Sequence, residues 1–278
     1  MHVGATTSQP ATTRGFRIAT QAAAEGAMFA ALAALIDRVG VYGSETEELA
    51  DAAMAQDVIT AVIAVPALAV ASRRAALGSA RAHLVSVGIL AFLAYNYAIY
   101  CFSVTFGPLF LFWTALLGLT TVLSVIGLWR AERLHMERLV QPGLLPSIVL
   151  CTVAVLFATL WLLEIVPDLH DGTGSTSAQQ WEVPTNPVHV LDLAFALPLA
   201  FLAGWGMRAR RRWAVLLAPV MLSFFVVMSL PIVATPFVAA LRGHAVAWGV
   251  VLPITSIAIL CAIALIQCLR VPTVTTDR

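Results

Sequence analysis

Long apolar runs separated by shorter polar stretches are the main pattern of this sequence. Each run approaches the roughly 17–25 residues that an α-helix needs to cross about 30 Å of hydrocarbon at about 1.5 Å per residue. The pattern therefore predicts an all-α protein, a polytopic bundle of eight transmembrane helices. The predicted spans cover residues 18–36, 57–73, 84–104, 108–130, 146–166, 187–207, 213–235 and 245–269.

The first run is the least regular, because Gln21 and Glu25 interrupt its first half. Arg14 and Arg17, followed by the alanine-rich AMFAALAALI, are also typical of a signal peptide, and its cleavage would leave seven spans. The internal repeat described below favours eight spans, because it requires the first span as the partner of the fifth.

The distribution of arginine predicts how the spans are oriented. Positively charged residues concentrate in the cytoplasmic loops of membrane proteins. With a cytoplasmic N-terminus, fourteen of the sixteen arginines fall inside, and only Arg38 and Arg242 fall outside. We therefore expect a protein of the bacterial cytoplasmic (inner) membrane with both termini in the cytoplasm, on tails at residues 1–17 and 271–278. The inner set is Arg14, Arg17, Arg73, Arg74, Arg81, Arg130, Arg133, Arg138, Arg208, Arg210, Arg211, Arg212, Arg270 and Arg278.

The order of the loops repeats halfway along the chain. In each half a long outer loop follows the first span, an arginine-rich inner turn follows the second, and a short outer turn joins the third and fourth. An even number of spans in each unit makes the two units parallel, related by an axis along the membrane normal. We therefore expect two membrane halves of four helices each, residues 18–140 and 141–270.

The sequence likeness between the halves is clearest around two prolines. IAVPALAVASRR, which contains Pro66, aligns with FALPLAFLAGWGMRAR, which contains Pro198, at an offset of 132 residues. A proline within a span removes a helical hydrogen bond and suits a helix that bends or lines a cavity. The same offset pairs Asp57 with His189 and Thr60 with Asp192.

The composition limits the class of function. The chain is 60% hydrophobic and 11% charged, with a mean hydropathy of +0.90, as expected of a membrane protein. A net charge of +1 gives no reason to expect nucleic acid as a partner. All sixteen basic residues are arginine, so no lysine is present for the Schiff base of a retinal protein.

The sequence lacks the motifs that would indicate a cofactor, a metal or a reaction. It contains no Walker A sequence, HExxH, GxSxG, CxxCH or intact dinucleotide fingerprint. The four cysteines are scattered over the predicted spans without a CxxC, which favours buried apolar residues over zinc or redox chemistry. We predict no cofactor and no metal, and the sequence favours a protein that is not an enzyme.

An ionisable pair lies in the first turns of the sixth predicted span. Asn186 is a favourable N-cap and Pro187 a favourable first helical residue. His189 and Asp192 follow at a spacing of three, which places them on one helix face. A carboxylate among lipid tails costs about 3 kcal/mol, so this face should point into the bundle. The pair either bonds neighbouring helices together or lines an outward-opening cavity.

Other polar residues are predicted at the same level of the membrane. Glu164 lies near the outer end of the fifth span, and Asp57 begins the second. Asn96 lies near the middle of the third span, where an amide needs a partner, and Tyr100 is one turn closer to the outside. Tyr100 alone would also fit an aromatic-belt anchor. The candidates for binding a ligand or lining the cavity are Asp192, His189, Glu164, Asp57, Asn96 and Tyr100.

Glu25 lies apart from this group, in the inner half of the first span. An intramembrane carboxylate is a candidate functional group, and proton coupling is the role that we consider for it. A hydrogen bond to another span would explain Glu25 equally well.

Three segments together resemble an uncharacterised family of bacterial and archaeal multi-pass integral membrane proteins with about eight spans. They are AQDVITAVIAVP, YNYAIYCFSVTFGPLFLFWTALLGL and TNPVHVLDLAFALPLAF, and the resemblance covers roughly residues 55–240. The short turn reads FGP where the family pattern has FNP, so Gly107 departs from it. The resemblance implies the architecture and draws attention to Asp57 and Asp192, and it implies no activity.

The sequence thus predicts a transporter or permease-like protein for a small solute or lipid, embedded in the bilayer, with an outward-facing polar cavity. A membrane-embedded enzyme that modifies lipids is an alternative, with Asp192 and His189 as acid, base or metal ligands. A structural or assembly subunit of a membrane complex is another. The sequence indicates no oligomeric state.

Overall fold

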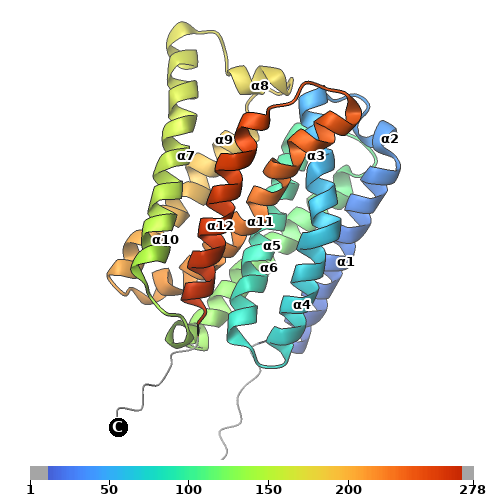
Figure 1. The fold of residues 1–278 in the computed structure, drawn as a ribbon. Helices are drawn as coiled ribbons and strands as arrows, with labels where there is room; N and C mark the ends of the chain where they lie inside the picture. Colours follow the sequence, from blue (N-terminus) through green and yellow to red (C-terminus); the bar gives the residue numbers. More distant parts are fainter. Residues whose placement is uncertain (1–11, 271–278) are drawn as a thin grey trace, which may run out of the picture.

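The computed structural model describes residues 12–270, and the regular structure within them is entirely helical. Eight helices in this range are long and apolar enough to cross a membrane, which confirms the predicted fold class and number of spans (Figure 1). The spans are α1 (Arg14–Ile36), α3–η1–α4 (Glu47–Ile59, Thr60–Ala64, Val65–Ala76), α5 (Ala80–Ser103), α6 (Phe110–Arg133), α7 (Leu144–Asp171), α9–η3–α10 (Pro187–Leu191, Asp192–Ala196, Leu197–Arg208), α11 (Arg212–Arg242) and α12 (Val251–Cys268). Shorter helices in the connections are α2 (Arg38–Tyr42), η2 (Met136–Leu139), α8 (Thr176–Gln180) and η4 (Trp248–Val250).

The second span begins earlier than its apolar run, which corrects the predicted start at residue 57. The Thr46 hydroxyl caps α3, and Glu47 and Glu48 occupy its first turn, where negative charge is favourable. The acidic stretch that we expected to be a loop is therefore helical. Asp57 lies well inside the span rather than at its outer end.

Two further spans are longer than predicted. Helix α7 continues to Asp171 and α11 to Arg242, beyond the predicted ends at residues 166 and 235. Both extensions lie at the end of the bundle that also carries α2 and α8 (Figure 1). We call this the α2/α8 end, and we call the other, where the loops 77–79, 134–143 and 209–211 lie, the arginine-rich end.

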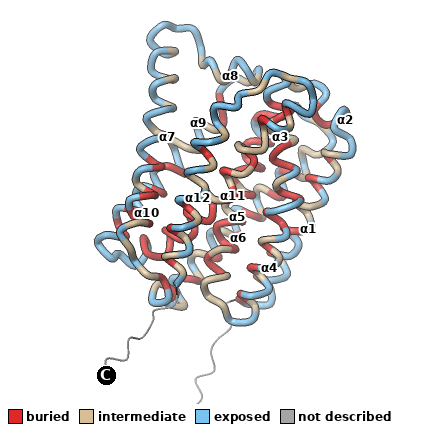
Figure 2. Tube along the Cα trace, in the orientation of Figure 1, coloured by how far each residue is buried: buried red, intermediate tan, exposed pale blue. Residues whose placement is uncertain are grey.

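Helices α5 and α11 form the centre of the bundle. In each, 78% of the most apolar stretch is buried, whereas the corresponding stretch of α12 is only 11% buried (Figure 2). The two central helices approach closely at Gly88, where an added Cβ atom would lie 2.5 Å from Ser223 Cβ and 2.6 Å from the Val220 carbonyl oxygen. Large apolar side chains are exposed on the outer helices, as expected for a surface in contact with lipid.

The packing of the spans follows the same plan in both halves. In the first half α1 packs on α3 and α4, α4 on α5, α5 on α6, and α6 on α1. In the second half α7 packs on α10, α10 on α11, α11 on α12, and α12 on α7. Across the centre α3 contacts α11, and α9 contacts α5. Gly88 and Val220, which meet at the centre, are 132 residues apart, the same offset as in the sequence comparison, and the repeat itself stays a prediction.

The spans that contain Pro66 and Pro198 are each interrupted by one turn of π-helix. In η1 the Val65 amide donates to the Thr60 carbonyl, and in η3 the Leu197 amide donates to the Asp192 carbonyl. Each π-turn directly precedes the segment that holds Pro66 or Pro198, whose ring nitrogen cannot donate a helical hydrogen bond. The two breaks therefore have the same position relative to a proline, although the prolines inside α7 and α11 lie in uninterrupted α-helix.

The turns that follow these spans also correspond. Gly78 and Arg210 both have a positive φ, of 98° and 52°. The amide after each returns to a carbonyl five residues earlier, Ser79 to Arg74 and Arg211 to Gly206, both at 3.0 Å. These residues again differ by 132, so the backbone likeness extends from the π-turns to the arginine-rich end.

An ion-pair cluster ties the two halves together at the α2/α8 end. The buried Asp51 carboxylate on α3 accepts from Arg242, the last residue of α11, and from His244 Nδ1 at 2.8 Å. The His244 Nε2 atom lies 3.7 Å from Glu47. This cluster gives a structural reason for one of the two arginines that depart from the charge bias.

Candidate functional site

The candidate residues form two clusters on different sides of α5. The Asp57 cluster comprises Tyr42, Asp57, Tyr97, Tyr100 and Trp113. The Asp192 cluster comprises Tyr95, Trp161, Glu164, His189 and Asp192. Five of the six candidates predicted from the sequence are therefore divided between the clusters, and Asn96 belongs to neither.

Asp57 is 3% exposed and lies within hydrogen-bonding distance of two tyrosine hydroxyls. Tyr42 Oη lies 2.6 Å from Asp57 Oδ2, and Tyr100 Oη lies 3.0 Å from Asp57 Oδ1. Tyr100 Oη is also 2.9 Å from the carbonyl oxygen of Ala53, one turn earlier on α3. Asp57 thus joins three elements, α2, α3 and α5, through hydroxyl groups.

Aromatic rings surround the Tyr100 ring. The Tyr100 ring centroid lies 5.0 Å from that of Trp113, 6.1 Å from that of Tyr97 and 6.4 Å from that of Tyr42, each in an edge-to-face arrangement. Such contacts stabilise beyond simple area burial by about 1 kcal/mol each. Tyr100 is therefore a buried member of the cluster, 2% exposed, rather than an anchor at the membrane surface.

Asn96 is buried at 1% exposure, and both polar atoms of its amide are without a hydrogen-bond partner among the described residues. Two buried polar atoms of the second span also lack a hydrogen-bond partner, Gln56 Nε2 and Thr60 Oγ1. A buried amide left unpaired costs about 1–3 kcal/mol per group, so these atoms mark places where water or a ligand would bind favourably.

Asp192 has one donor for each carboxylate oxygen. Tyr95 Oη donates to Oδ1 at 2.9 Å, and Trp161 Nε1 donates to Oδ2 at 2.8 Å. Asp192 opens the π-turn η3, so its carboxylate lies at the break in the span. The carboxylate joins α5, α7 and the broken span.

His189 packs between this carboxylate and the α2/α8 end. Its ring centroid lies 4.6 Å from that of Trp161, and its Nε2 atom is 3.8 Å from Glu164 Oε2. Glu164 Oε1 accepts from the backbone amide of Ser177 on α8. His189 is buried, whereas Trp161, Glu164 and Asp192 are partly exposed.

Glu25 makes no hydrogen bond or ion pair with a member of either cluster. It is exposed on α1 and accepts a hydrogen bond from Gln21 Nε2 at 2.9 Å. The proton-coupling role considered for Glu25 therefore stays a prediction, on a helix surface rather than in the interior.

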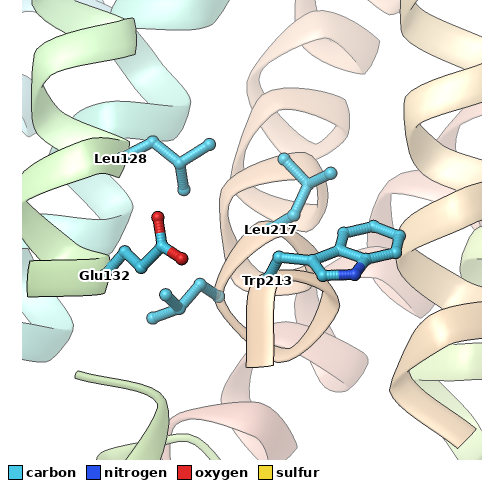
Figure 3. A pocket seen from close by; sticks show the side chains of 5 residues that line it. Leu128, Glu132, Trp213 and Leu217 are labelled. Carbon is cyan, nitrogen blue, oxygen red and sulfur yellow. The ribbon is translucent and has the colours of Figure 1, made fainter. Parts of the chain in front are cut away.

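Two small hollows lie at the arginine-rich end. One, of about 100 Å³, is lined by α6 and α11, and the Glu132 carboxylate points into it (Figure 3). The other, of about 220 Å³, lies beside Gly143 and Arg208. Neither is lined by a predicted site residue, and Asp57, Asn96 and Tyr100 are enclosed, so this conformation is closed over them.

Comparison with known proteins supplies no activity for these clusters. No protein-family model, no curated protein and no solved structure matches the chain. The resemblance to a family of multi-pass membrane proteins therefore stays a prediction. Within residues 12–270 no three His, Cys, Asp or Glu side chains are placed to hold a metal ion.

Several members of the clusters were not among the predicted site residues. Tyr42 follows the first span, and nothing in its local sequence indicates that it reaches Asp57 on the next helix. Tyr95 and Trp161 resemble ordinary apolar or belt residues until the helices are placed together. The tyrosine-rich stretch of α5 indicated that a site could lie nearby. It did not indicate which tyrosine contacts which carboxylate.

We expect Trp161→Phe to lower the free energy of unfolding by about 1–3 kcal/mol, because it leaves Asp192 Oδ2 without its donor. SDS titration in mixed micelles measures this change. Trp205→Phe is the matched control, because Trp205 is exposed on α10, and it should change stability by no more than about 0.5 kcal/mol. Equal losses in both variants would contradict a stabilising role for the Trp161 hydrogen bond.

Proposed function

We propose that this protein is a membrane transporter for a small solute, and that Asp57 and Asp192 belong to its binding and coupling sites. The observation that carries the proposal is the pair of broken spans. Each has a carboxylate near the start of its π-turn, Asp192 as its first residue and Asp57 three residues before it, and each carboxylate is hydrogen-bonded to the central helix α5. Ionisable residues inside membrane proteins are concentrated at solute and proton pathways.

The arrangement of the halves supports this proposal. Parallel repeats related by an axis along the membrane normal are one of the architectures of secondary transporters, which bind solutes near the midplane at interrupted helices. Here the interrupted spans α3–η1–α4 and α9–η3–α10 each contact the central helix of the other half. A π-turn beside a proline leaves the helix locally less constrained, and this suits segments that move during alternating access.

The chemistry of the clusters favours a cationic or proton-coupled solute. Tyrosine hydroxyls, rather than arginine or histidine, pair with Asp57. A carboxylate enclosed by aromatic rings fits a small organic ammonium, because the rings attract a cation through their faces. The unpaired Asn96 amide would offer such a solute both a donor and an acceptor.

The orientation follows from charge. The arginine-rich end would face the cytoplasm of a bacterial cell, with both termini inside, and the α2/α8 end would face outward. Asp57 and Asp192 both lie in the halves of their spans nearer the α2/α8 end. The closed conformation would then open towards that end by movement of α2 or α8.

Charge movement across proteoliposomes tests the proposal. We expect concentration jumps of choline, small primary amines and amino acids to give transient currents on a solid-supported membrane, for at least one of these solutes. Asp57→Ala and Asp192→Ala should abolish the current, while Asp171→Ala, at an exposed position on α7, should keep it. Folded protein that gives no current but releases a headgroup from added lipid would instead support a lipid-modifying enzyme. Protein that does neither would support an assembly subunit.

A further inference from the structure

The two tyrosine hydroxyls around Asp57 make three contacts at hydrogen-bonding distance but carry only two protons. Tyr42 Oη lies 2.6 Å from Oδ2, and Tyr100 Oη lies within bonding distance of two acceptors, Asp57 Oδ1 at 3.0 Å and the Ala53 carbonyl at 2.9 Å. A phenol carries a single proton, so the two tyrosines supply two protons for three contacts. Two lone-pair-bearing oxygens held about 3 Å apart without a proton between them repel each other.

We propose that Asp57 is a neutral carboxylic acid in this conformation and is the proton-exchanging group of the protein. The acid proton lies on Oδ1 and is donated to Tyr100 Oη, and Tyr100 donates its own proton to the Ala53 carbonyl. Tyr42 donates to Oδ2, and every contact then contains one proton. The inference deepens the proposed transport function, because it names the proton as the ligand held at this site.

The charged surroundings agree with a neutral Asp57. The titratable groups that face it are Tyr42 on α2, and Tyr97 and Tyr100 on α5, and none is a cation. Burial raises the pKa of the Tyr42 phenol well above its ordinary value, so its hydroxyl keeps its proton and acts as a donor. An ionised carboxylate enclosed in a membrane protein without a cation is strongly disfavoured.

The helices packed around α3 supply no counter-charge either. The central helix α11 has no ionisable side chain between its terminal residues Arg212 and Arg242. On α1 the ionisable side chains are all exposed, and on α3 itself the nearest carboxylate, Asp51, is already paired. The exposed groups of α1 are Arg14, Arg17 and Glu25.

Asp192 provides an internal contrast. Its two oxygens receive two donors, Tyr95 Oη and Trp161 Nε1, neither of which is shared with another acceptor. His189 lies on the same helix face, and Asp192 itself is only partly buried. Two oxygens with two unshared donors need no additional proton, so the hydrogen-bond geometry that requires an acid proton at Asp57 is absent at Asp192.

When Asp57 releases its proton, rotation of the Tyr100 hydroxyl supplies a new donor to the carboxylate. The Oδ1–H bond breaks, the proton passes to water or to a basic solute, and the carboxylate keeps the electron pair. The Tyr100 hydroxyl then turns from the Ala53 carbonyl towards Oδ1. Release thus converts a three-proton network into a two-proton network with both carboxylate oxygens paired.

Infrared spectroscopy of protein labelled with ¹³C-carboxyl aspartate tests this inference without any transport assay. We expect the isotope-shifted carbonyl band of a protonated carboxylic acid in the wild type at neutral pH, its loss in Asp57→Asn and its retention in Asp192→Asn. Raising the pH should remove the band. No labelled acid band at neutral pH, or a band that is lost only in Asp192→Asn, would overturn the inference.

Thermal unfolding in detergent gives a second test. Asparagine at residue 57 can donate from Nδ2 to Tyr100 as the acid does, so Asp57→Asn should leave the melting temperature unchanged. Asparagine at residue 192 would set an amide donor against Tyr95 or Trp161, so Asp192→Asn should lower the melting temperature by several degrees. The opposite order would contradict a neutral Asp57. If Asp57→Asn does not fold, Asp57→Glu replaces it in the infrared test, where the labelled aspartate band should disappear.

Discussion

Gly88→Val is expected to cost about 3 kcal/mol or more of unfolding free energy, which makes it one of the two most damaging single substitutions considered. A Cβ atom at this position would lie 2.5 Å from Ser223 Cβ and 2.6 Å from the Val220 carbonyl oxygen. The second contact is with backbone, which cannot rotate away as a side-chain tip can. The central helices α5 and α11 would have to separate, and every other span packs on one of them or on its neighbours.

Gly118→Val is the matched control for this substitution. Gly118 also lies within a spanning helix, α6, but an added Cβ atom there would meet nothing within 4 Å. Both variants therefore carry the same change in helix propensity, and their difference isolates the crossing of α5 and α11. SDS titration should show a large loss for Gly88→Val and a small change for Gly118→Val. Similar values would indicate that the crossing is not tightly packed.

Arg242→Met is expected to lower the free energy of unfolding by about 2 kcal/mol, because it leaves the Asp51 carboxylate buried without its main cation. The expected loss is below that for a fully enclosed ion pair, since the Arg242 side chain is 30% exposed and His244 remains beside Asp51. The same titration in mixed micelles measures it. The substitution weakens the contact between α3 and α11, which joins the two halves.

Arg38→Met separates this role from the general effect of removing an outer arginine. Arg38 is the other arginine at the α2/α8 end and is exposed at the start of α2, so its replacement should change stability by no more than about 0.5 kcal/mol. The double variant Asp51→Asn with Arg242→Met should recover part of the loss, because it removes both charges. Additive losses in the double variant would show that the two side chains do not stabilise each other.

The eight spans could be predicted from the sequence because long apolar runs have few alternatives to crossing a membrane. The boundary of the second span could not, because residues 47–56 are acidic and form a helix that packs against α11 and other parts of the protein. Hydropathy records affinity for lipid, whereas this extension is stabilised by its cap and its contacts. Asp57 was therefore placed at a helix end, although it lies one third of the way into the span.

The carboxylates of the candidate site could be predicted from the sequence, but the side chains that bond to them could not. Asp57 and Asp192 attract attention in any apolar run, because an ionisable group there must be paired. Which tyrosine of α5 reaches which carboxylate depends on the rotation of α5 and on the helices beside it. Tyr95 was left out for this reason, and Tyr42 because its loop folds back across the end of the bundle.

The two carboxylates hold the same helix by tyrosines five residues apart, Tyr95 and Tyr100, which project about 140° from one another around α5. Any turn of α5 that lengthens one of these hydrogen bonds alters the other. If Asp57 and Asp192 bind as proposed, their occupancies would be thermodynamically linked through α5. The linkage would be reciprocal, so a proton at one site would change affinity at the other by the same factor as the reverse. In this arrangement both carboxylates are bonded to α5, so a rotation of α5 would couple the halves without any contact between the two sites themselves.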